Sequence, residues 1–321
     1  MKDQDFIVTR INANYLPHEE LTCPYFDAYL ESTSGGDESI KRRICAMIGY
    51  LLLPGYPGKK ILVLGTAKDS GKSMFSRFVQ SLVGQDQVCA QSPFETTERH
   101  ALAEFAGRTI NMALDIPSSL LKPSTVSLMK TLSGGDLVSV NPKGRDRYSQ
   151  ICFAKQVLGT NAPIRLQQYD EAFWSRVTII PYLHSIRQEN QIHNLESKLL
   201  KERDAIVTMC IREAQELIEN GYEFPKCPVA EEMKDVWIGW QPYAADFLSN
   251  CCDERSGAFT PTRKLYSAYL QYCQERGCPA TSEKGLVAYA KHQFPNVQSG
   301  RTMIDSIQSR GLANLFFDED F

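Results

Sequence analysis

KILVLGTAKDSGKS, residues 60–73, joins a short apolar run to a loop that ends in glycine, lysine and serine. The apolar run Ile61–Leu64 is typical of a buried strand in a parallel sheet, and residues 72–83 have the pattern of a helix. A loop placed between a strand and a helix can aim backbone N–H groups and a helix N-terminus at phosphate oxygens. The stretch therefore predicts a phosphate-binding loop, or P-loop, inside an α/β fold.

The roles of the loop residues follow from this placement. Lys72 would neutralise the β and γ phosphates of a nucleotide, and the hydroxyl of Ser73 would be a ligand of Mg²⁺. The expected nucleotide contacts are Thr66, Ala67, Lys68, Asp69, Ser70, Gly71, Lys72 and Ser73. The pattern GxxxxGK[ST] has glycine at position 66, whereas this chain has Thr66 after Gly65. The alternative is a Gly–Ser turn that happens to precede a lysine and a serine.

Strand and helix patterns alternate from the loop to Pro181. They predict a helix near Thr97–Phe105, a strand at Thr109–Leu114, a helix at Ser124–Leu132, and strands at Leu137–Val140, Gln150–Leu158 and Val177–Pro181. Such alternation predicts an α/β core with a mainly parallel sheet. The expected domains are a helical region (1–57), the ATPase core (58–183), a helical lid or linker (184–240), and short helices with a Gly- and Ser-punctuated tail (241–321).

Three polar residues stand at the ends of the expected strands. Asp115 follows the apolar residues 110–114 and could hold the Mg²⁺ shell, although an aspartate before a turn can also be a cap. No second carboxylate follows, because residue 116 is isoleucine. Asn161 could touch the γ-phosphate or its attacking water, and Arg176 precedes a strand. Taken alone, Asn161 would be a loop amide and Arg176 a surface cation. Because they follow a P-loop and an acid-ended strand, they indicate a sensor and an arginine finger.

A basic turn lies between two of the strands. The tip of an expected hairpin carries three basic residues, Lys143, Arg145 and Arg147, and a single acid, Asp146. Such a tip suits contact with a phosphate backbone. A solvated turn is the equal alternative.

Composition limits the remaining function classes. The chain has 321 residues and 35 Lys plus Arg against 38 Asp plus Glu, so its formal net charge is -3 and only local patches could bind nucleic acid. Residues 261–310 hold seven basic and three acidic side chains, which fits a docking surface or a solvated face. The ten cysteines form no CxxC pair, which argues against zinc and against a secreted disulfide framework. With a charged N-terminus and no long apolar stretch, we expect a soluble, cytoplasmic protein without a membrane partner.

The order of these motifs resembles a known family. Five features follow one another along the chain: GKS, the acid-ended strand, MKTLSGGD (129–136), TNAP (160–163) and an arginine before an apolar strand. This order resembles the helicase part of phage and plasmid primase-helicases, the poxvirus-primase-like branch of superfamily three. The segments CPYF (23–26) and GYLL (49–52) are similar to the family's N-terminal helical region. Residues 244–248 and 265–269 are similar to the opening helices of its winged-helix domain.

The resemblance implies an AAA+-like P-loop ATPase that uses ATP and Mg²⁺. Lys72 and Ser73 would bind nucleotide and metal, Asp115 would be the Walker B acid and metal partner, and Asn161 would be the sensor. Arg176 would be the finger that reaches a neighbour's site. The hairpin tip at Lys143 and Arg145 would follow single-stranded DNA through a ring, most simply a hexamer.

The implied function is an ATP-dependent DNA helicase in the replication of a phage, plasmid or other mobile element. It could contact origin duplex DNA. It could also act with a separate primase, because nothing before residue 57 resembles a polymerising site. The alternatives are an ATP-binding switch or scaffold and an origin-recognition protein without processive unwinding. Two departures bear on these alternatives: the family usually has Glu or paired acids where this chain has Asp115-Ile116, and its P-loop usually begins with Gly.

Overall fold

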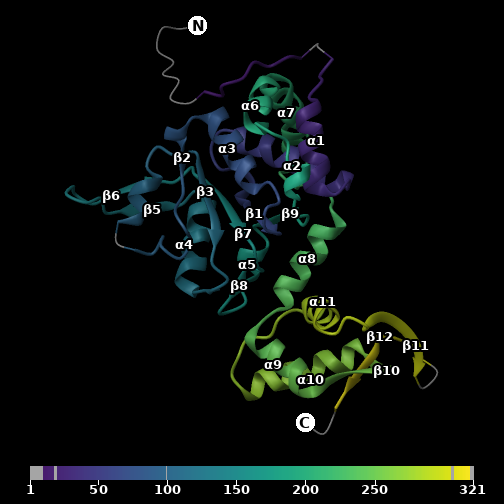
Figure 1. The fold of residues 1–321 in the computed structure, drawn as a ribbon. Helices are drawn as coiled ribbons and strands as arrows, with labels where there is room; N and C mark the ends of the chain where they lie inside the picture. Colours follow the sequence, from purple (N-terminus) through teal and green to yellow (C-terminus); the bar gives the residue numbers. More distant parts are fainter. Residues whose placement is uncertain (1–9, 18–19, 99, 305–306, 319–321) are drawn as a thin grey trace. The chain divides into compact units, whose positions relative to one another are not determined.

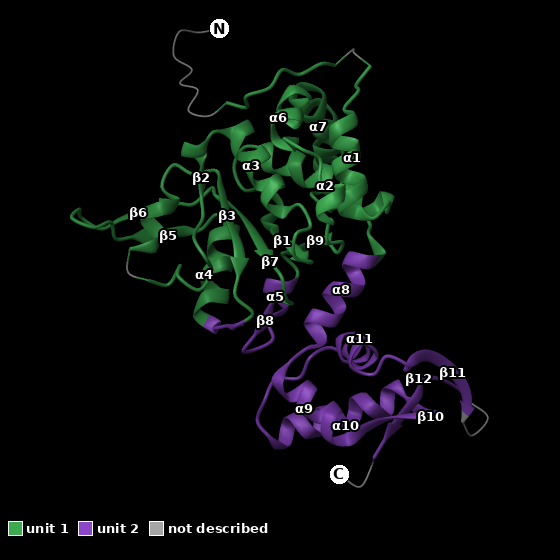
Figure 2. Ribbon diagram, viewed as in Figure 1, with its two compact units in different colours: residues 1–118, 124–163, 175–228 green, residues 119–123, 164–174, 229–321 purple. Residues whose placement is uncertain are grey.

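The computed structural model describes residues 10–17, 20–98, 100–304 and 307–318, and it divides the chain into two compact units (Figure 2). Unit 1 comprises residues 1–118, 124–163 and 175–228. Unit 2 comprises residues 119–123, 164–174 and 229–321. Two short segments from the middle of the sequence therefore belong to the same unit as the C-terminal residues.

Unit 1 is built on a five-stranded sheet of strand order β2-β3-β7-β1-β9 (Figure 1). Its pairings are parallel, so the prediction of an α/β fold with a parallel sheet is confirmed. Ile61–Leu64 are fully buried because β1 lies between β7 and β9. The strands are β1 (Ile61–Thr66), β2 (Val88–Cys89), β3 (Ile110–Ile116), β7 (Lys155–Thr160) and β9 (Val177–Tyr182).

Helices pack on this sheet and on one another. Helix α2 contacts β9 and α7, and α3 contacts β3 and α6. Asp37 begins α2 as its N-cap, since its carboxylate accepts hydrogen bonds from the N–H groups of Ser39 (2.8 Å) and Ile40 (3.3 Å). The helices of this part are α1 (Pro24–Ser34), α2 (Glu38–Leu52), α3 (Lys72–Val83), α4 (Pro123–Gly134), α6 (Leu195–Lys201) and α7 (Arg203–Glu219).

A hairpin of β5 (Leu137–Val140) and β6 (Tyr148–Ile151) projects from the sheet between α4 and β7 (Figure 1). Val138 and Val140 are buried in a small cluster with Cys152, while Leu137 on the other face is 69% exposed. The expected single strand Gln150–Leu158 is wrong. The chain leaves the hairpin after Ile151 and buries Cys152 and Ala154 before it enters the central sheet.

Two helix predictions need correction. The expected helix near Thr97–Phe105 is only a 3-10 turn at Ala101–Phe105. The stretch from residue 184 becomes α-helical only at Leu195, and before it Ser185 and Ile186 bond to the backbone carbonyls of Lys68 and Asp69.

Unit 2 combines a short parallel pair with a three-stranded antiparallel sheet of order β10-β12-β11. Leu265, Tyr269, Leu286 and Leu312 lie at the centre of its core. Strand β10 was not expected, and the Gly- and Ser-punctuated tail is a hairpin. Its elements are β4 (Leu120–Leu121), β8 (Arg165–Leu166), α5 (Glu171–Trp174), α8 (Pro228–Gly239), α9 (Pro242–Cys251), β10 (Cys252–Pro261), α10 (Thr262–Glu275), α11 (Glu283–Gln293), β11 (Gln298–Ile304) and β12 (Ile307–Phe317). Within the described ranges, no helix has the length and apolar character needed to cross a membrane.

Lys155, the first residue of β7, is a lysine buried in unit 1 with only 1% of its surface exposed. Its Nζ donates hydrogen bonds to the carbonyl oxygens of Leu53 (2.6 Å) and Leu51 (3.5 Å), at the C-terminal end of α2. The negative end of the helix dipole thus faces the ammonium group. Burial nevertheless lowers the pKa of Lys155 from 10.5 to about 8.

The substitution Lys155→Met is expected to remove a pH dependence of stability. The folded protein loses this proton near pH 8, whereas the unfolded chain loses it near pH 10.5. Burial of the ammonium therefore destabilises the folded state fully below pH 8, and this destabilisation disappears as the pH rises to 10.5. The free energy of unfolding of the wild type, relative to that of Lys155→Met, should rise by roughly 3 kcal/mol across this window. Urea unfolding of both proteins at a series of pH values measures this. A difference that stays constant with pH would contradict the assignment.

Candidate functional site

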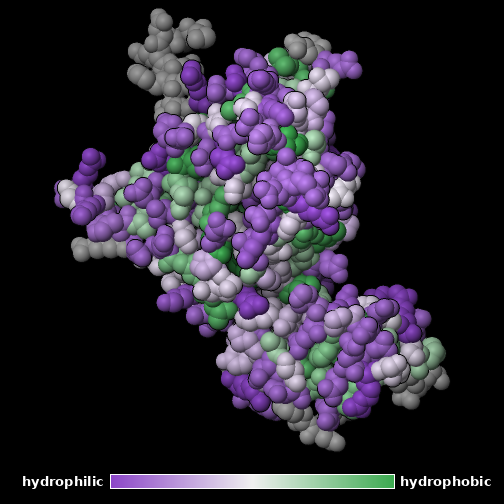
Figure 3. All heavy atoms as spheres, in the orientation of Figure 1, coloured by the Kyte–Doolittle hydropathy of each residue, from purple (hydrophilic) through white to green (hydrophobic). Residues whose placement is uncertain are grey.

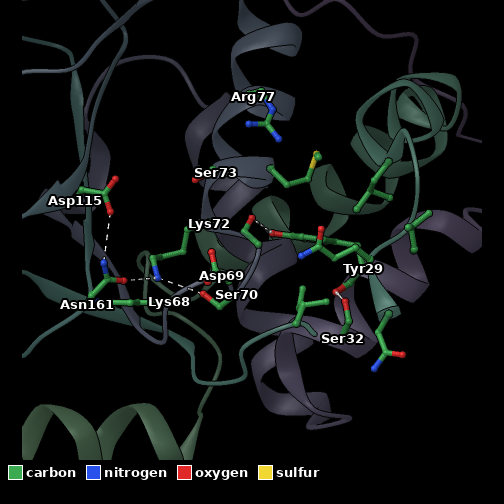
Figure 4. Close-up of a pocket in the computed structure, with 17 residues that line it drawn as sticks. Tyr29, Ser32, Lys68, Asp69, Ser70, Lys72, Ser73, Arg77, Asp115 and Asn161 are labelled. Carbon is green, nitrogen blue, oxygen red and sulfur yellow. Dashed lines mark hydrogen bonds between the residues drawn. The ribbon is translucent and has the colours of Figure 1, made fainter. Parts of the chain in front are cut away.

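A pocket of about 500 Å³ lies in unit 1 at the carboxyl edge of the parallel sheet (Figure 4). Parallel strands end at one edge, so side chains that follow β1, β3 and β7 meet there. The helix α3 begins at the same place with Lys72. The lining residues are Tyr29, Ser32, Lys68, Asp69, Ser70, Gly71, Lys72, Ser73, Met74, Arg77, Asp115, Asn161, Ile186, Asn190, Gln191, Ile192 and Leu195.

A chain of hydrogen bonds joins the three predicted chemical groups of this pocket. Lys72 Nζ donates to Asn161 Oδ1 over 3.1 Å, and Asn161 Nδ2 donates to Asp115 Oδ1 over 3.5 Å (Figure 4). Lys72 Nζ also donates to the hydroxyl of Ser70 (3.2 Å) and to the carbonyl oxygen of Ala67. The lysine, the amide and the acid come from α3, the end of β7 and β3, so the sheet brings together residues 46 and 89 positions apart.

The charged form of Lys72 is disfavoured by its burial in the pocket. Burial lowers the pKa of Lys72, and the nearby carboxylates of Asp115 and Asp69 act in the opposite direction. The two carboxylates therefore do not fully offset the effect of burial on the ammonium. An anion in the pocket would supply further negative charge.

Asp115 stands at an irregular point of β3. The register between β3 and β7 shifts between Ala113 and Ile116, and Asp115 has a φ of 58°, in the left-handed region. Aspartate tolerates this region better than most side chains do. At this shift Asp115 is exposed, while the next residue, Ile116, is buried.

The oxygen atoms available in the pocket fit a hard cation. Ser73 and Asp115 both line it, and Mg²⁺ prefers such hydroxyl and carboxylate oxygens together with water and phosphate. Among the described residues, no group of three or more His, Cys, Asp or Glu side chains could hold a metal ion.

The pocket contains most, but not all, of the predicted nucleotide contacts. Lys68 to Ser73 line it, whereas Thr66 and Ala67 do not. Thr66 ends β1 and pairs with Tyr182 of β9. The basic residues Lys143, Arg145 and Arg147 lie on the projecting hairpin.

Arg176 does not line the pocket in its own chain. Its Nη1 donates hydrogen bonds to the carbonyl oxygen of Lys130 and to the hydroxyl of Ser133 (2.8 Å), at the C-terminal end of α4. A Cβ at Gly134 would lie 2.8 Å from an Asp136 carboxylate oxygen and 3.6 Å from Arg176 Nη1, so a larger residue would crowd this arrangement. The segment 129–136 therefore holds Arg176 at the end of α4.

Several residues of the pocket were missed by the sequence analysis. Tyr29 and Ser32 come from α1, and Ile186 to Leu195 come from the stretch after β9. No local pattern marks these distant residues. Arg77 could have been found, because it lies four positions after Ser73 and so shares its face of α3; its Nε bonds to Glu196 over 3.0 Å.

Comparison with protein families gives two matches along the chain. A family of unknown function (DUF5906) matches residues 63–176, the part from β1 to Arg176. The family described as Poxvirus D5 protein-like matches residues 244–308, within unit 2.

Solved structures give the fold. The apo structure of the NrS-1 C-terminal region in its A form has a TM-score of 0.54 and 9% sequence identity, and the match covers 94% of this chain and 77% of that chain. A second apo structure of that region has a TM-score of 0.51 with the same identity and coverage. The X-ray structure of JCV helicase matches 71% of this chain and 64% of that chain at 14% identity, with a TM-score of 0.34.

The two family matches fall on the part that contains the ordered motifs, residues 63–176, and on the C-terminal part, residues 244–308. The Poxvirus D5 protein-like match lies where winged-helix similarity was expected, and the NrS-1 likeness extends over nearly the whole chain. The predicted resemblance is confirmed: residues 244–308 are similar to the Poxvirus D5 protein-like family, and the fold of the chain is similar to that of the NrS-1 C-terminal region.

Proposed function

We propose that this protein is an ATP-dependent, ring-forming DNA helicase of superfamily three that acts in the replication of a phage, plasmid or other mobile element. The observation that carries the proposal is the hydrogen-bonded chain Lys72–Asn161–Asp115 at the carboxyl edge of the parallel sheet. A cation, an amide and a carboxylate in this order supply what phosphoryl transfer to water needs.

In this proposal the residues act on the terminal phosphate of ATP. The P-loop N–H groups and Lys72 bind the β and γ phosphates, and Lys72 leaves Ala67 and Ser70 for the nucleotide. Asn161 orients the attacking water beside the γ-phosphate. Ser73 and Asp115 would hold Mg²⁺, which neutralises charge on the phosphate oxygens when bound. ATP and water then give ADP and phosphate.

The hairpin β5–β6 is the proposed contact with single-stranded DNA. Lys143, Arg145 and Arg147 are exposed at its tip, and the described part of the chain gives them no acidic partner. In the space-filling view, the projecting hairpin ends in hydrophilic residues (Figure 3). Tyr148, 41% exposed, follows the tip and could stack on a base.

The double substitution Lys143→Ala with Arg145→Ala is expected to weaken binding of single-stranded DNA and to flatten its salt dependence. Each lost phosphate contact lowers the slope of log K against log salt by about 0.7. Fluorescence anisotropy with a labelled oligonucleotide at several salt concentrations measures the slope.

The matched control is Lys41→Ala with Arg42→Ala, which removes the same charge from residues that pair with glutamates on α1, α2 and α7. Intrinsic ATPase should survive in both double variants. An unchanged slope for the hairpin variant would mean that the tip is only a solvated turn.

For the C-terminal residues we propose a winged-helix domain that contacts duplex or origin DNA. The support is the element order α9-β10-α10-α11-β11-β12 and the excess of basic side chains over 261–310. Lys284 is already paired with Asp235 (2.7 Å), and Arg276 lies over the ring of Tyr272 at 3.6 Å. Arg263, Arg301 and Arg310 therefore carry more of the proposed DNA contact than these two.

The proposal includes assembly into a ring, most simply a hexamer, in which Arg176 serves a neighbouring site, and a primase as partner. Multiple-turnover ATPase measured with and without single-stranded DNA, beside a sizing measurement, tests it. We expect DNA to stimulate hydrolysis in an assembled species. A monomer with no nucleotide turnover under either condition would contradict the proposal.

A further inference from the structure

Two elements that the sequence motif does not include form hydrogen bonds with the expected phosphate loop. One is the segment Tyr182–Ile186, here called the strap, which continues from the end of β9. The other is Tyr29 of α1. All of these residues belong to unit 1.

The strap follows the loop residue by residue. The carbonyl oxygen of Tyr182 accepts from the N–H of Ala67 over 2.7 Å. The hydroxyl of Ser185 donates to the carbonyl oxygen of Lys68 over 2.8 Å. The N–H of Ile186 donates to the carbonyl oxygen of Asp69 over 2.9 Å. Three successive loop residues are thus fixed by the same five-residue segment.

Tyr29 fixes the end of the loop. Its hydroxyl donates to the carbonyl oxygen of Gly71 over 3.3 Å and shares a 2.9 Å hydrogen bond with the hydroxyl of Tyr182. Both tyrosines are buried, at 2% and 0% exposure, so water does not compete for these bonds. A Cβ on Gly71, whose φ is 94°, would lie 2.9 Å from Thr33 and 3.0 Å from the ring of Tyr29. Helix α1 therefore packs directly against the loop.

These bonds decide where the loop's N–H groups point. In a trans peptide unit the C=O and the following N–H point in opposite directions, and the peptide units from Lys68 to Lys72 are trans. The carbonyls of Lys68 and Asp69 are directed at the strap, and the carbonyl of Gly71 accepts both from the N–H of Phe75 in α3 over 3.0 Å and from the hydroxyl of Tyr29. The N–H groups of Asp69 and Ser70 are consequently turned away from the strap, and the N–H of Lys72 is turned away from the hydroxyl of Tyr29. N–H groups that are not bonded to the strap or α1 can donate to phosphate oxygens.

We propose that Tyr29, Tyr182 and Ser185 are positioning residues that preorganise the backbone of the phosphate loop for the phosphates of the nucleotide. The inference rests on the proposed nucleotide site and adds the residues that set its geometry. Without the strap and Tyr29, the loop must be ordered when the nucleotide binds, and that ordering reduces affinity. The effect falls on phosphate binding more than on turnover of the bound nucleotide.

The test is calorimetric binding of Mg²⁺–ADP to Tyr29→Phe, Ser185→Ala and the double variant. One hydroxyl hydrogen bond contributes modestly, so we expect Kd to rise about 3-fold for each single variant and about 10-fold for the double variant. Ser185→Thr keeps the hydroxyl and should restore most of the affinity. The KM for ATP should rise with Kd, while kcat changes less.

Tyr50→Phe is the matched control. Tyr50 is also fully buried, and its hydroxyl also donates to a backbone carbonyl, that of Pro57 over 2.7 Å, but it does not line the pocket. It should lower the melting temperature as much as Tyr29→Phe does and leave the Kd of Mg²⁺–ADP unchanged.

Three outcomes are separable. A raised Kd in the strap variants, with the control at the wild-type value, supports the proposal. The same Kd in the double variant and the control would overturn the positioning role and leave the proposed function standing. A wild-type protein that binds neither Mg²⁺–ADP nor Mg²⁺–ATP would contradict the nucleotide site itself.

Discussion

Lys72→Ala is expected to reduce ATP hydrolysis by about 100-fold or more while the protein stays folded. Among the described residues the Lys72 side chain bonds to three polar atoms, Ala67 O and the pocket atoms Ser70 Oγ and Asn161 Oδ1. Removing a charged donor from a developing anionic centre has an effect of this size. Because burial lowers the pKa of Lys72, its ammonium contributes little to stability in the nucleotide-free protein.

Steady-state ATPase and thermal melting, measured on the same preparation, check this expectation. Lys41→Ala is the control, since it removes a lysine whose Nζ bonds to Glu31 and Glu38, away from the pocket. A folded Lys72→Ala protein with near-normal turnover would remove the phosphate loop from the mechanism.

Arg176→Ala is expected to spare nucleotide binding and to reduce turnover by ~10³–10⁵, the range for an arginine that stabilises charge on the transferred phosphoryl group in trans. In the structure this guanidinium bonds to Lys130 and Ser133 of its own chain. To reach a neighbour's nucleotide it would exchange these bonds for phosphate oxygens. Single-turnover hydrolysis and nucleotide binding, measured together, separate lost chemistry from lost binding.

Ser133→Ala distinguishes the two roles open to Arg176. It removes one hydrogen bond that holds the guanidinium at the end of α4 but leaves the arginine in place. If Arg176 acts as a finger, Ser133→Ala should retain most of the turnover. If the arginine matters only because it fastens α4, both variants should lose activity and stability together.

Mixing two inactive proteins tests whether the finger acts between subunits. Arg176→Ala subunits have an intact phosphate loop, and Lys72→Ala subunits have an intact finger. A mixed ring contains some interfaces where a good Lys72 faces a good Arg176, so activity should partly return. If the mixture stays inactive after subunit exchange is confirmed, titration of each variant into wild type shows whether Arg176 acts within its own chain or every site is required.

The sequence predicts the centre of the fold well for a physical reason. A parallel strand buried on both faces must be continuously apolar, and Ile61–Leu64 meets that requirement before the glycine-rich loop and α3. Asp115 and Asn161 could be placed beside Lys72 because parallel strands end at one edge. These are the parts of the site where local sequence and topology agree.

Other parts depend on contacts that no local pattern records. Tyr29 and Ser185 lie 42 and 117 positions from the loop residues to which they bond. The bonds of Arg176 to the end of α4 are equally long-range, spanning 46 and 43 positions. In unit 2, strand β10 was missed because its middle residues, from Asp253 to Gly257, are polar and exposed and lack the alternation of a half-buried strand.

Strand displacement on a forked DNA duplex tests the central proposal most directly, because it separates a helicase from a nucleotide-binding switch and from an origin-recognition protein. The wild type with ATP and Mg²⁺ should release the displaced strand, and Lys72→Ala at the same concentration should not. Wild-type protein that hydrolyses ATP in response to single-stranded DNA, yet releases no strand from the fork at any protein concentration, would contradict the account.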